Sequence, residues 1–385
     1  MSASTLLRKL LRALAGLLIL LLGYMGVFTL RASGADYPVI APASAHGSWV
    51  RGAYHVHTRR SDGRGTLEEV AAAARRAGLD FVVLTDHNDF APRAPARVDG
   101  VLIIPGVELS TPHGHLVALG SPRPLPPSAR EGGIDAVRAA GGLGFLAHPV
   151  QRKNPWRDWA SAPRATGLEL YSADTMFREA TARPLSLLLP AAGAYFGRPE
   201  HGLLMLAQAP HEATERLLSL ASAGPMVALC AHDAHGLPAY EDVFRTLALY
   251  VAAPPGGLAE DPARAAAQVT QALGAGDSLC VFRALGEPGP FSLQLPQSSA
   301  GPGERVARVG DVLELGLPPH PSERVRLRVW GSGRVREDGR SVELTGPGAV
   351  QVEVWVLGPG DLFGEAWRPW IVPSPVRVLP RAAGI

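Results

Sequence analysis

The stretch GAYHVHTRRSDGRG contains two histidines placed two residues apart, His55 and His57. An acidic residue, Asp62, follows them closely. Side chains at positions i and i+2 of a β-strand point to the same side, so the two imidazoles can reach one point in space. Neutral imidazoles beside a carboxylate are ligands of borderline transition metals. Two solvated histidines at a strand end are the alternative, and the rest of the chain decides between the two.

Further residues of metal-ligand type occur near the ends of other apolar runs. They are His87 after FVVLTD, Glu108 in VLIIPGVEL, His115 at the start of HLVALG, His148 after LGFLA, and Asp233 and His235 after MVALCA. One histidine near a strand end is more often a satisfied core group than a ligand. Because sites in β/α barrels are built at the C-terminal ends of the strands, several such residues at successive runs predict one shared metal site.

The elements that would position these residues alternate between short apolar runs and helical patterns from residue 51 to about 285. AYHVHT and FVVLTDHN predict strands. TLEEVAAAARRAGL predicts a helix with a capping box of Thr66 and Glu69 and an end at Gly78. This alternation predicts an α/β fold of the β/α-barrel type.

The order H-x-H, S-D-G, T-D-H, G-V-E-L-S, H-L-V-A-L-G, A-H-P and D-x-H resembles the PHP (polymerase and histidinol phosphatase) family over about residues 51–285. The resemblance implies a distorted (β/α)7 TIM-like barrel with a trinuclear metal site in its mouth. It implies that one metal is held by His55, His57, Glu108 and Asp233, a second by Glu108, His115 and His148, and a third by Asp62, His87 and His235. The expected cofactors are therefore two to three divalent ions of Zn, Mn or Fe.

Such a site predicts hydrolysis. Closely spaced divalent ions lower the pKa of a bound water toward about 7 and polarise a phosphoryl or carbonyl oxygen. We expect a metal-dependent hydrolase of a small-molecule ester, with a phosphoester or phosphodiester favoured and no catalytic group beyond the metal-bound hydroxide. The alternatives are a carbamate or carboxylic ester hydrolase, an enzyme acting on nucleotides or nucleic-acid 5′ ends, and a non-catalytic metal-stabilised binding module.

A few polar residues near these motifs have weaker claims to a role. Asp86 either supports a histidine ligand or satisfies backbone donors. Arg59, Arg152 and Lys153 could each hold a substrate phosphate, although a solvated surface charge is the simpler interpretation. His232 precedes Asp233 and is interpreted as a packing residue, because it faces the other way if the strand continues.

The N-terminus carries a membrane signal. Arg8, Lys9 and Arg12 precede the uncharged run 13–30, which is close to the lower length limit of a membrane-spanning helix. The basic residues predict a cytoplasmic N-terminus, with residues 1–31 as a single-pass signal anchor and the body on the extracytoplasmic (periplasmic or extracellular) side. Secretion after cleavage near Ala35 is the alternative.

The rest of the chain predicts a second domain and few partners. Residues 32–50 are interpreted as a linker, and beyond residue 285 strictly alternating segments such as AVQVEVWV predict a small all-β, Ig-like sandwich over 286–385. The ending EAWRPWIVPSPVRVL loosely resembles the carbaryl-hydrolase-type branch of the PHP enzymes, some of which cleave carbamates. The 37 basic and 35 acidic residues make a nucleic-acid partner unfavoured, and no protein partner can be inferred.

Cys230 and Cys280 are interpreted as buried small hydrophobic residues. An oxidising compartment would permit a disulfide between them, and the sequence does not decide whether one forms.

Overall fold

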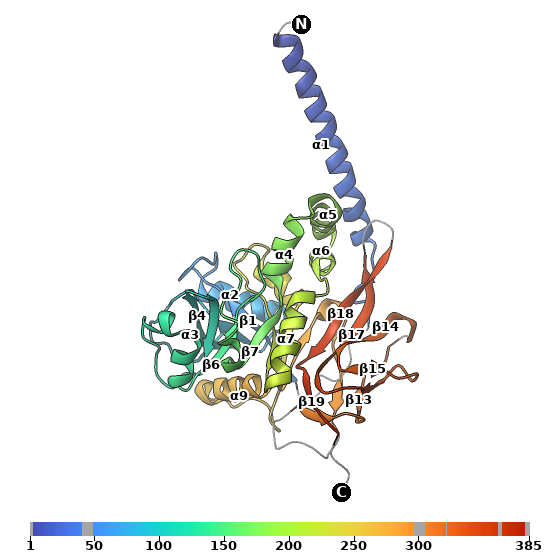
Figure 1. The fold of residues 1–385 in the computed structure, drawn as a ribbon. Coiled ribbons are helices and arrows are strands. Elements are labelled where there is room, and N and C mark those ends of the chain that lie inside the picture. The colour runs from blue at the N-terminus through green and yellow to red at the C-terminus, as the bar shows by residue number, and fades with distance from the viewer. Residues whose placement is uncertain (1–2, 41–48, 296–304, 321, 361–363, 382–385) are drawn as a thin grey trace.

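The computed structural model describes residues 3–40, 49–295, 305–320, 322–360 and 364–381. One long helix projects from a mixed α/β body, and antiparallel strands flank the body on one side (Figure 1). The predicted linker 32–50 falls partly outside the described residues. Within its described part, Ile40 is buried and donates its N–H to the Leu285 carbonyl at 2.6 Å, so this portion of the chain packs onto the body.

Seven strands form the part of the large sheet that carries the site. They follow one another in the sheet in the order β1 (Trp49–Val56), β2 (Phe81–Leu84), β4 (Val101–Thr111), β5 (Gly114–Leu119), β6 (Leu143–Leu146), β7 (Gly167–Ser172) and β8 (Val227–Ala231). A parallel bridge between Val56 and Ala234 links the segment after β8 back to the end of β1. The run of strands therefore returns on itself, and its continuously apolar strands β2 and β8 are buried throughout.

Strand β5 is an exception to the predicted alternation of parallel strands and helices. It pairs antiparallel with both β4 and β6, whereas β1–β2, β2–β4, β6–β7 and β7–β8 are parallel pairs. The cause is the connection between β4 and β5, which consists only of Pro112 and His113. So short a turn can join antiparallel strands but cannot hold a crossover helix. The hairpin places the start of β5 beside the end of β4.

Helices connect most of the other strands. α2 (Leu67–Arg76) begins with the predicted capping box, in which the Glu69 N–H donates to Thr66 Oγ1 and the Thr66 N–H donates to the Glu69 carboxylate. The chain turns at Gly78, whose φ of +71° suits a residue without a side chain. The other helices of the body are α3 (Ala129–Ala139), α4 (Ala173–Thr181), α5 (Leu189–Gly197), α6 (Pro199–Leu206), α7 (His211–Ala223), α8 (Tyr240–Thr246) and α9 (Pro262–Ala275), with short turns η1 (Ala162–Arg164), η2 (Pro184–Leu188), η3 (Arg283–Leu285) and η4 (Ser322–Arg324).

The large sheet continues past β1 into the C-terminal strands. β9 (Ala248–Ala252) pairs with β1 and with β10 (Ser278–Val281), and β10 pairs antiparallel with β18 (Glu365–Pro373). The sheet is completed by β17 (Gly348–Pro359), β19 (Val376–Leu379), β12 (Val306–Arg308), β14 (Val325–Gly331) and β3 (Ala96–Val98). A separate antiparallel sheet has the order β11 (Ser292–Gln294), β13 (Val312–Gly316), β16 (Ser341–Leu344) and β15 (Gly333–Val335).

Strand β17 departs from the half-buried pattern that its alternating sequence predicts. Gln351 and Glu353 occupy its polar positions, yet both side chains are completely buried. α7 packs against β17 (Figure 1), and the Glu353 carboxylate faces Tyr171 of β7 and Trp330 of β14, so other elements cover this strand. One polar atom of each side chain has a partner: Gln351 Nε2 donates to the Pro373 carbonyl, and Glu353 Oε2 accepts a hydrogen bond from Trp355 Nε1, each at 2.7 Å.

The projecting helix is α1 (Ala3–Ser33). Among the described residues it is the one helix long and apolar enough to cross a membrane, with a mean hydropathy of 2.2. A signal sequence shares these properties. The first two thirds of α1 make almost no contact with the body, whereas Phe28 and Ala32 near the end of α1 are buried.

Both cysteines are buried free thiols, Cys230 in β8 and Cys280 in β10. This agrees with their interpretation as small hydrophobic residues of the core.

Candidate metal centre

The nine predicted ligands lie together at one end of the strand ring. Most follow the C-terminal ends of parallel strands: His57 and Asp62 after β1, His87 after β2, His148 after β6, and Asp233 and His235 after β8. Three lie within strands, His55 near the end of β1, Glu108 in β4 and His115 in β5. The antiparallel hairpin explains His115, because it brings the start of β5 to the rim that Glu108 occupies; the His115 Nδ1 lies 2.7 Å from the Glu108 carboxylate.

Glu108 is the carboxylate around which the imidazoles gather. It is completely buried. Its Oε1 lies 2.7 Å from His115 Nδ1 and 3.1 Å from His148 Nε2. Its Oε2 lies 3.2 Å from the Nε2 atoms of His55 and His57. Its Oε2 also lies 3.0 Å from His87 Nδ1. The two oxygens therefore face different sets of imidazoles, which is the arrangement expected of a carboxylate that bridges two cations.

Asp233 adds a second buried carboxylate to the same group. Its Oδ1 lies 3.5 Å from His55 Nε2 and 3.3 Å from His57 Nε2. Its Oδ2 lies 4.0 Å from His148 Nε2. Two carboxylates thus approach the same pair of imidazole nitrogens from different elements, β4 and the segment after β8.

The H-x-H pair converges by a route that differs from the expected flat strand. β1 ends at Val56, and its pairing with β2 shifts register between Ala53 and Val56. His55 has a φ of +64°, and His148 and Asp233 also have positive φ. The rings of His55 and His57 still approach to 5.0 Å between centroids. Left-handed backbone at non-glycine residues is strained and concentrates at functional sites, so the strain here aims ligand side chains inward.

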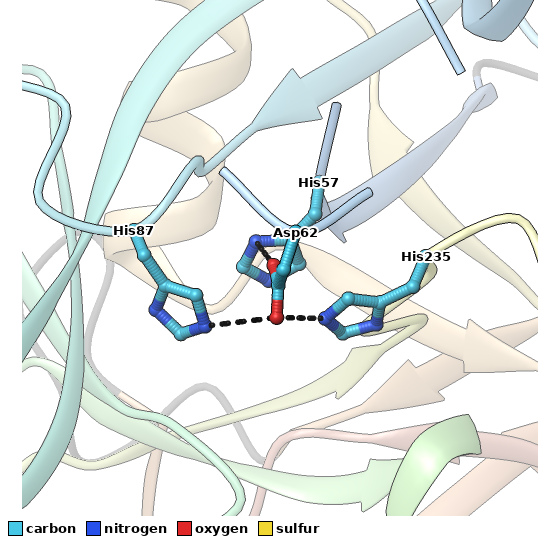
Figure 2. A group of neighbouring side chains, drawn as sticks. All are labelled: His57, Asp62, His87 and His235. Carbon is cyan, nitrogen blue, oxygen red and sulfur yellow. Dashed lines mark ion pairs between the residues drawn. The ribbon is translucent and has the colours of Figure 1, made fainter. Parts of the chain in front are cut away.

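Asp62 forms the centre of a second, more open group with His57, His87 and His235 (Figure 2). Its Oδ2 lies 3.3 Å from His235 Nε2 and 3.7 Å from His87 Nε2, and its Oδ1 lies 3.5 Å from His57 Nδ1. The Asp62 side chain is 56% exposed, whereas Glu108 is fully enclosed. This group therefore lies at the solvent side of the cluster.

The cluster suits divalent cations because several of its buried nitrogen and oxygen atoms have no hydrogen-bond partner among the described residues. These atoms include His55 Nε2, His57 Nε2, His87 Nδ1 and Glu108 Oε2. Buried polar atoms are otherwise nearly always paired. The contacts of 3.2 to 3.5 Å between the Nε2 atoms of His55 and His57 and the oxygens of Glu108 and Asp233 match the edge of a tetrahedron around zinc, about 3.4 Å for bonds near 2.1 Å. The donors are thus spaced to surround ions.

Glu169 supports this arrangement and was not among the sequence candidates. It is buried in β7, where its carboxylate accepts a hydrogen bond from His55 Nδ1 at 2.6 Å and one from the His148 N–H at 2.7 Å. With Nδ1 protonated toward Glu169, the lone pair of His55 Nε2 is directed at the cluster. His235 is fixed likewise, because its Nδ1 donates to the Asp233 carbonyl at 2.8 Å. Glu169 is the single charged residue of the strand GLELYS, and this feature of the sequence could have marked it as a candidate.

The hydrogen bonds of Asp86 hold a loop in place and do not go to a histidine ring. Its carboxylate accepts hydrogen bonds from the Thr58 N–H at 2.7 Å and from the hydroxyls of Thr58 and Ser61 at 2.8 Å each. These contacts hold the loop between His57 and Asp62. Asp86 therefore satisfies a backbone donor and at the same time supports two ligands indirectly.

Electrostatics concentrate negative charge in the cluster. Burial acts to raise the pKa of Glu108 and Asp233, but the surrounding imidazoles outweigh it and hold both pKa values well below their usual range. The hydrogen bond from His235 is the main cause that lowers the pKa of Asp62. Burial acts to lower the pKa of His57, but the hydrogen bonds with Asp233 and Glu108 raise it to about 9. Three ionised carboxylates thus attract positive charge to this site.

The predicted phosphate-binding residues lie around the cluster without entering it. Arg59 is exposed and its guanidinium lies 3.5 Å from Glu69. Arg152 lines a pocket of about 320 Å³ that also reaches His148. Lys153 is exposed beside Arg152. Their roles toward a substrate stay predictions.

Two residues of α4 at the rim were also missed. Asp174 forms an ion pair with Arg178, and Gln151 Nε2 donates to the Asp174 carboxylate at 3.1 Å. Burial is the main cause that raises the pKa of Asp174, and the nearby charge of Asp233 adds to it. The pair thus lies within electrostatic reach of the cluster. Neither residue belongs to an apolar run, so the strand-end pattern could not reveal them.

His232 is a packing residue, as predicted. Its Nδ1 accepts from the Tyr54 N–H at 3.1 Å, and its Nε2 donates to the Leu247 carbonyl at 2.8 Å. Burial lowers its pKa to about 4, so the ring is neutral.

No family model matches the sequence, and no curated protein matches it. Three solved structures are similar in part. A two-domain protein from Bacteroides vulgatus ATCC 8482, described as containing a predicted PHP-like metal-dependent phosphoesterase, shares 15% identity at a TM-score of 0.43, with 91% of this chain and 92% of that chain covered.

The other two similarities cover about half of this chain. A protein from Bifidobacterium adolescentis ATCC 15703, described as a proposed metal-dependent phosphoesterase, shares 17% identity at a TM-score of 0.30, over 48% of this chain and 87% of that one. An amidohydrolase from Chromobacterium violaceum shares 14% identity at a TM-score of 0.29, over 48% and 87%.

Proposed function

We propose that the chain is a metal-dependent hydrolase of phosphoesters or phosphodiesters, with a site for two to three divalent cations in the mouth of a distorted (β/α)7 PHP-type barrel. The observation that carries the proposal is the convergence of six imidazoles and three carboxylates, in which buried atoms of His55, His57, His87 and Glu108 have no hydrogen-bond partner among the described residues and face one another. A purely structural cluster would satisfy these atoms with hydrogen bonds. The seven-strand ring with its closing bridge supports the barrel.

The geometry supports a specific division of the ligands. We assign Glu108 as the bridge between two buried cations, because its two oxygens face different sets of imidazoles. We assign Asp62 and His235, together with His87, to a cation nearer the solvent. The remaining ligands of the buried cations are His55, His57, His115, His148 and Asp233.

Divalent cations held here would activate a water molecule and polarise the ester oxygen. The residues of the chain supply the preorganisation. Glu169 keeps the His55 proton on Nδ1, and the Asp233 carbonyl does the same for His235. The half-exposed Asp62 leaves the outer side of the cluster accessible. Because several closely spaced cations can clamp both the attacking and the leaving oxygen, this arrangement suits a phosphoryl centre.

We also propose that α1 anchors the protein in the cell membrane with the site on the extracytoplasmic side. The uncharged run 13–30 and the basic residues before it support this orientation. Secretion after cleavage near Ala35 would leave the site on the same side of the membrane.

The test combines metal analysis with turnover on the full chain in lipid nanodiscs. Elemental analysis should find two to three Mn, Fe or Zn ions per chain, and chelation should abolish hydrolysis of p-nitrophenyl phosphate or bis-p-nitrophenyl phosphate. Glu108→Gln and Asp233→Asn should lose metal and activity, whereas Glu337→Gln at an exposed position should lose neither.

Two outcomes would contradict the proposal. Unchanged metal content in both ligand variants would exclude the assigned ligands, and no metal after reconstitution would remove the basis of the function. Turnover of p-nitrophenyl acetate or a p-nitrophenyl carbamate, without turnover of either phosphate ester, would replace the phosphoesterase by a carboxylic ester or carbamate hydrolase.

A further inference from the structure

The segment Pro184–Gly197 is an uncharged element on the surface of the body. It consists of η2, with five residues, and α5, with nine. Two of its large apolar side chains project outward, Leu185 with 64% and Phe196 with 74% exposure. A helix of this length is too short to cross the hydrocarbon core of a bilayer, about 30 Å thick, but it is typical of segments that lie in the bilayer surface.

This segment is fixed to the projecting helix α1 by close backbone contacts. A Cβ atom on Gly193 would lie 2.4 Å from the Met25 carbonyl oxygen, and one on Gly197 would lie 2.3 Å from that of Thr29. Thr29 Oγ1 donates to the Gly193 carbonyl at 2.7 Å. Small residues four positions apart are the device by which helices approach closely within membranes. α5 and the end of α1 therefore form one rigid pair.

The position of α5 along α1 sets the depth of α5 in a bilayer that α1 crosses. The uncharged run 13–30 of α1 is about 27 Å long at 1.5 Å per residue, close to the thickness of the hydrocarbon core. α5 approaches α1 closely at Met25 and Thr29, near the end of that run. An α1 that crosses the bilayer therefore brings Leu185 and Phe196 to the bilayer surface.

The same face of the molecule carries the rim of the metal centre. β7, which contains Glu169, leads directly into α4, and α4 packs against η2. In Figure 1, α4 and α5 lie between the strand ring and the projecting part of α1. The C-terminal ends of the parallel strands, where the ligands lie, therefore point toward the side from which α1 leaves the body.

We propose that Pro184–Gly197 rests in the surface of the bilayer that α1 crosses, and that the metal centre takes the phosphoester headgroup of a membrane-embedded amphiphile as its substrate. This inference rests on the proposed function and specifies the substrate class of the same site. The continuity of the apolar segment with α1 supports the bilayer as its occupant, because both apolar surfaces meet at one level of the molecule.

The first test measures depth on the full chain in phosphatidylcholine nanodiscs. Phe196→Cys carries a nitroxide label, and Arg334→Cys on β15, at the far side of the body, serves as the control. Cys230 and Cys280 are buried, so the label reacts at the introduced thiol. The label at position 196 should be accessible to oxygen and shielded from a water-soluble relaxation agent. The label at position 334 should be accessible to the water-soluble agent and less accessible to oxygen. Equal exposure of both labels to water would overturn the bilayer contact.

The second test measures turnover in nanodiscs that also contain phosphatidic acid. Leu185→Asp with Phe196→Asp should lower hydrolysis of phosphatidic acid about tenfold and leave that of p-nitrophenyl phosphate unchanged. An unchanged rate on the lipid would overturn the role of the segment. A wild-type chain that cleaves p-nitrophenyl phosphate but no lipid would overturn the substrate class alone. A metal-loaded wild-type chain that cleaves neither would refute the hydrolase itself.

Discussion

Glu169→Gln isolates the contribution of one hydrogen bond to metal binding. The Glu169 carboxylate accepts from two donors at once, His55 Nδ1 at 2.6 Å and the His148 N–H at 2.7 Å. A glutamine has only one acceptor oxygen. If that oxygen faces the His148 N–H, the amide NH₂ faces His55 and forces its proton onto Nε2, the nitrogen that would bind metal. If the amide is turned round, the His148 N–H is left facing another donor in a buried site.

The expected magnitude follows from the role of such partners. Removal of the group behind a histidine ligand lowers metal affinity by about 10- to 100-fold. This corresponds to roughly 1.4 to 2.7 kcal/mol of binding free energy. The volume of the side chain hardly changes, so no cavity contributes to the loss.

The assay is competitive titration of the chelator-stripped full chain with Mn²⁺ and Zn²⁺. The matched control is Glu179→Gln, because Glu179 lines the pocket beside His148 without a hydrogen bond to any predicted ligand. Glu169→Gln should keep the full number of ions at saturation but bind them more weakly, whereas Glu179→Gln should match the wild type. Equal metal affinities for the two variants would refute the idea that Glu169 orients His55.

Other substitutions test the supports of the fold and the site. Asp86→Asn should weaken metal binding at the solvent-side group and cost about 1 to 3 kcal/mol of stability, measured by titration and urea unfolding, because one acceptor that anchors the loop is lost. Gly52→Ala should lower the melting temperature without changing metal content, since its Cβ would lie 2.2 Å from the Phe81 ring and cost about 1 to 3 kcal/mol. Burial is the main cause that raises the pKa of Glu353, so the folded state binds its proton more tightly than the unfolded state does. The wild type should therefore lose stability as pH rises from about 4.5 through the raised value, and Glu353→Gln should abolish this slope; identical pH profiles would exclude a protonated Glu353.

Local pattern was enough to select the nine candidate ligands that the structure brings together. Most of the nine candidates lie in or just after an apolar run, His115 begins one, and Asp62 follows the H-x-H pair closely; the chemistry of imidazoles and carboxylates depends on residue type alone. The capping box of Thr66 and Glu69 was predictable for the same reason, because its partners lie three residues apart. The buried strands β2 and β8 also follow from their continuous apolar runs.

Contacts between distant segments were beyond the reach of local pattern. The strict polar alternation in β17 predicted a solvent face, but other elements pack against this strand and bury Gln351 and Glu353. The antiparallel pairing of β4 and β5 is a local feature by contrast, because a connection of two residues leaves no room for a crossover helix.

The chain by itself thus determined which residue types could bind metal and near which strand ends they stand. The tertiary structure decided which atoms face one another. Glu169 and His55 are 114 residues apart, and no local periodicity relates them. The positive φ of His55 and the joining of α5 to α1 likewise depend on segments that meet only after folding. Hydrogen bonds and close packing act over a few ångströms in space, whereas periodicity and composition report only on neighbours along the chain.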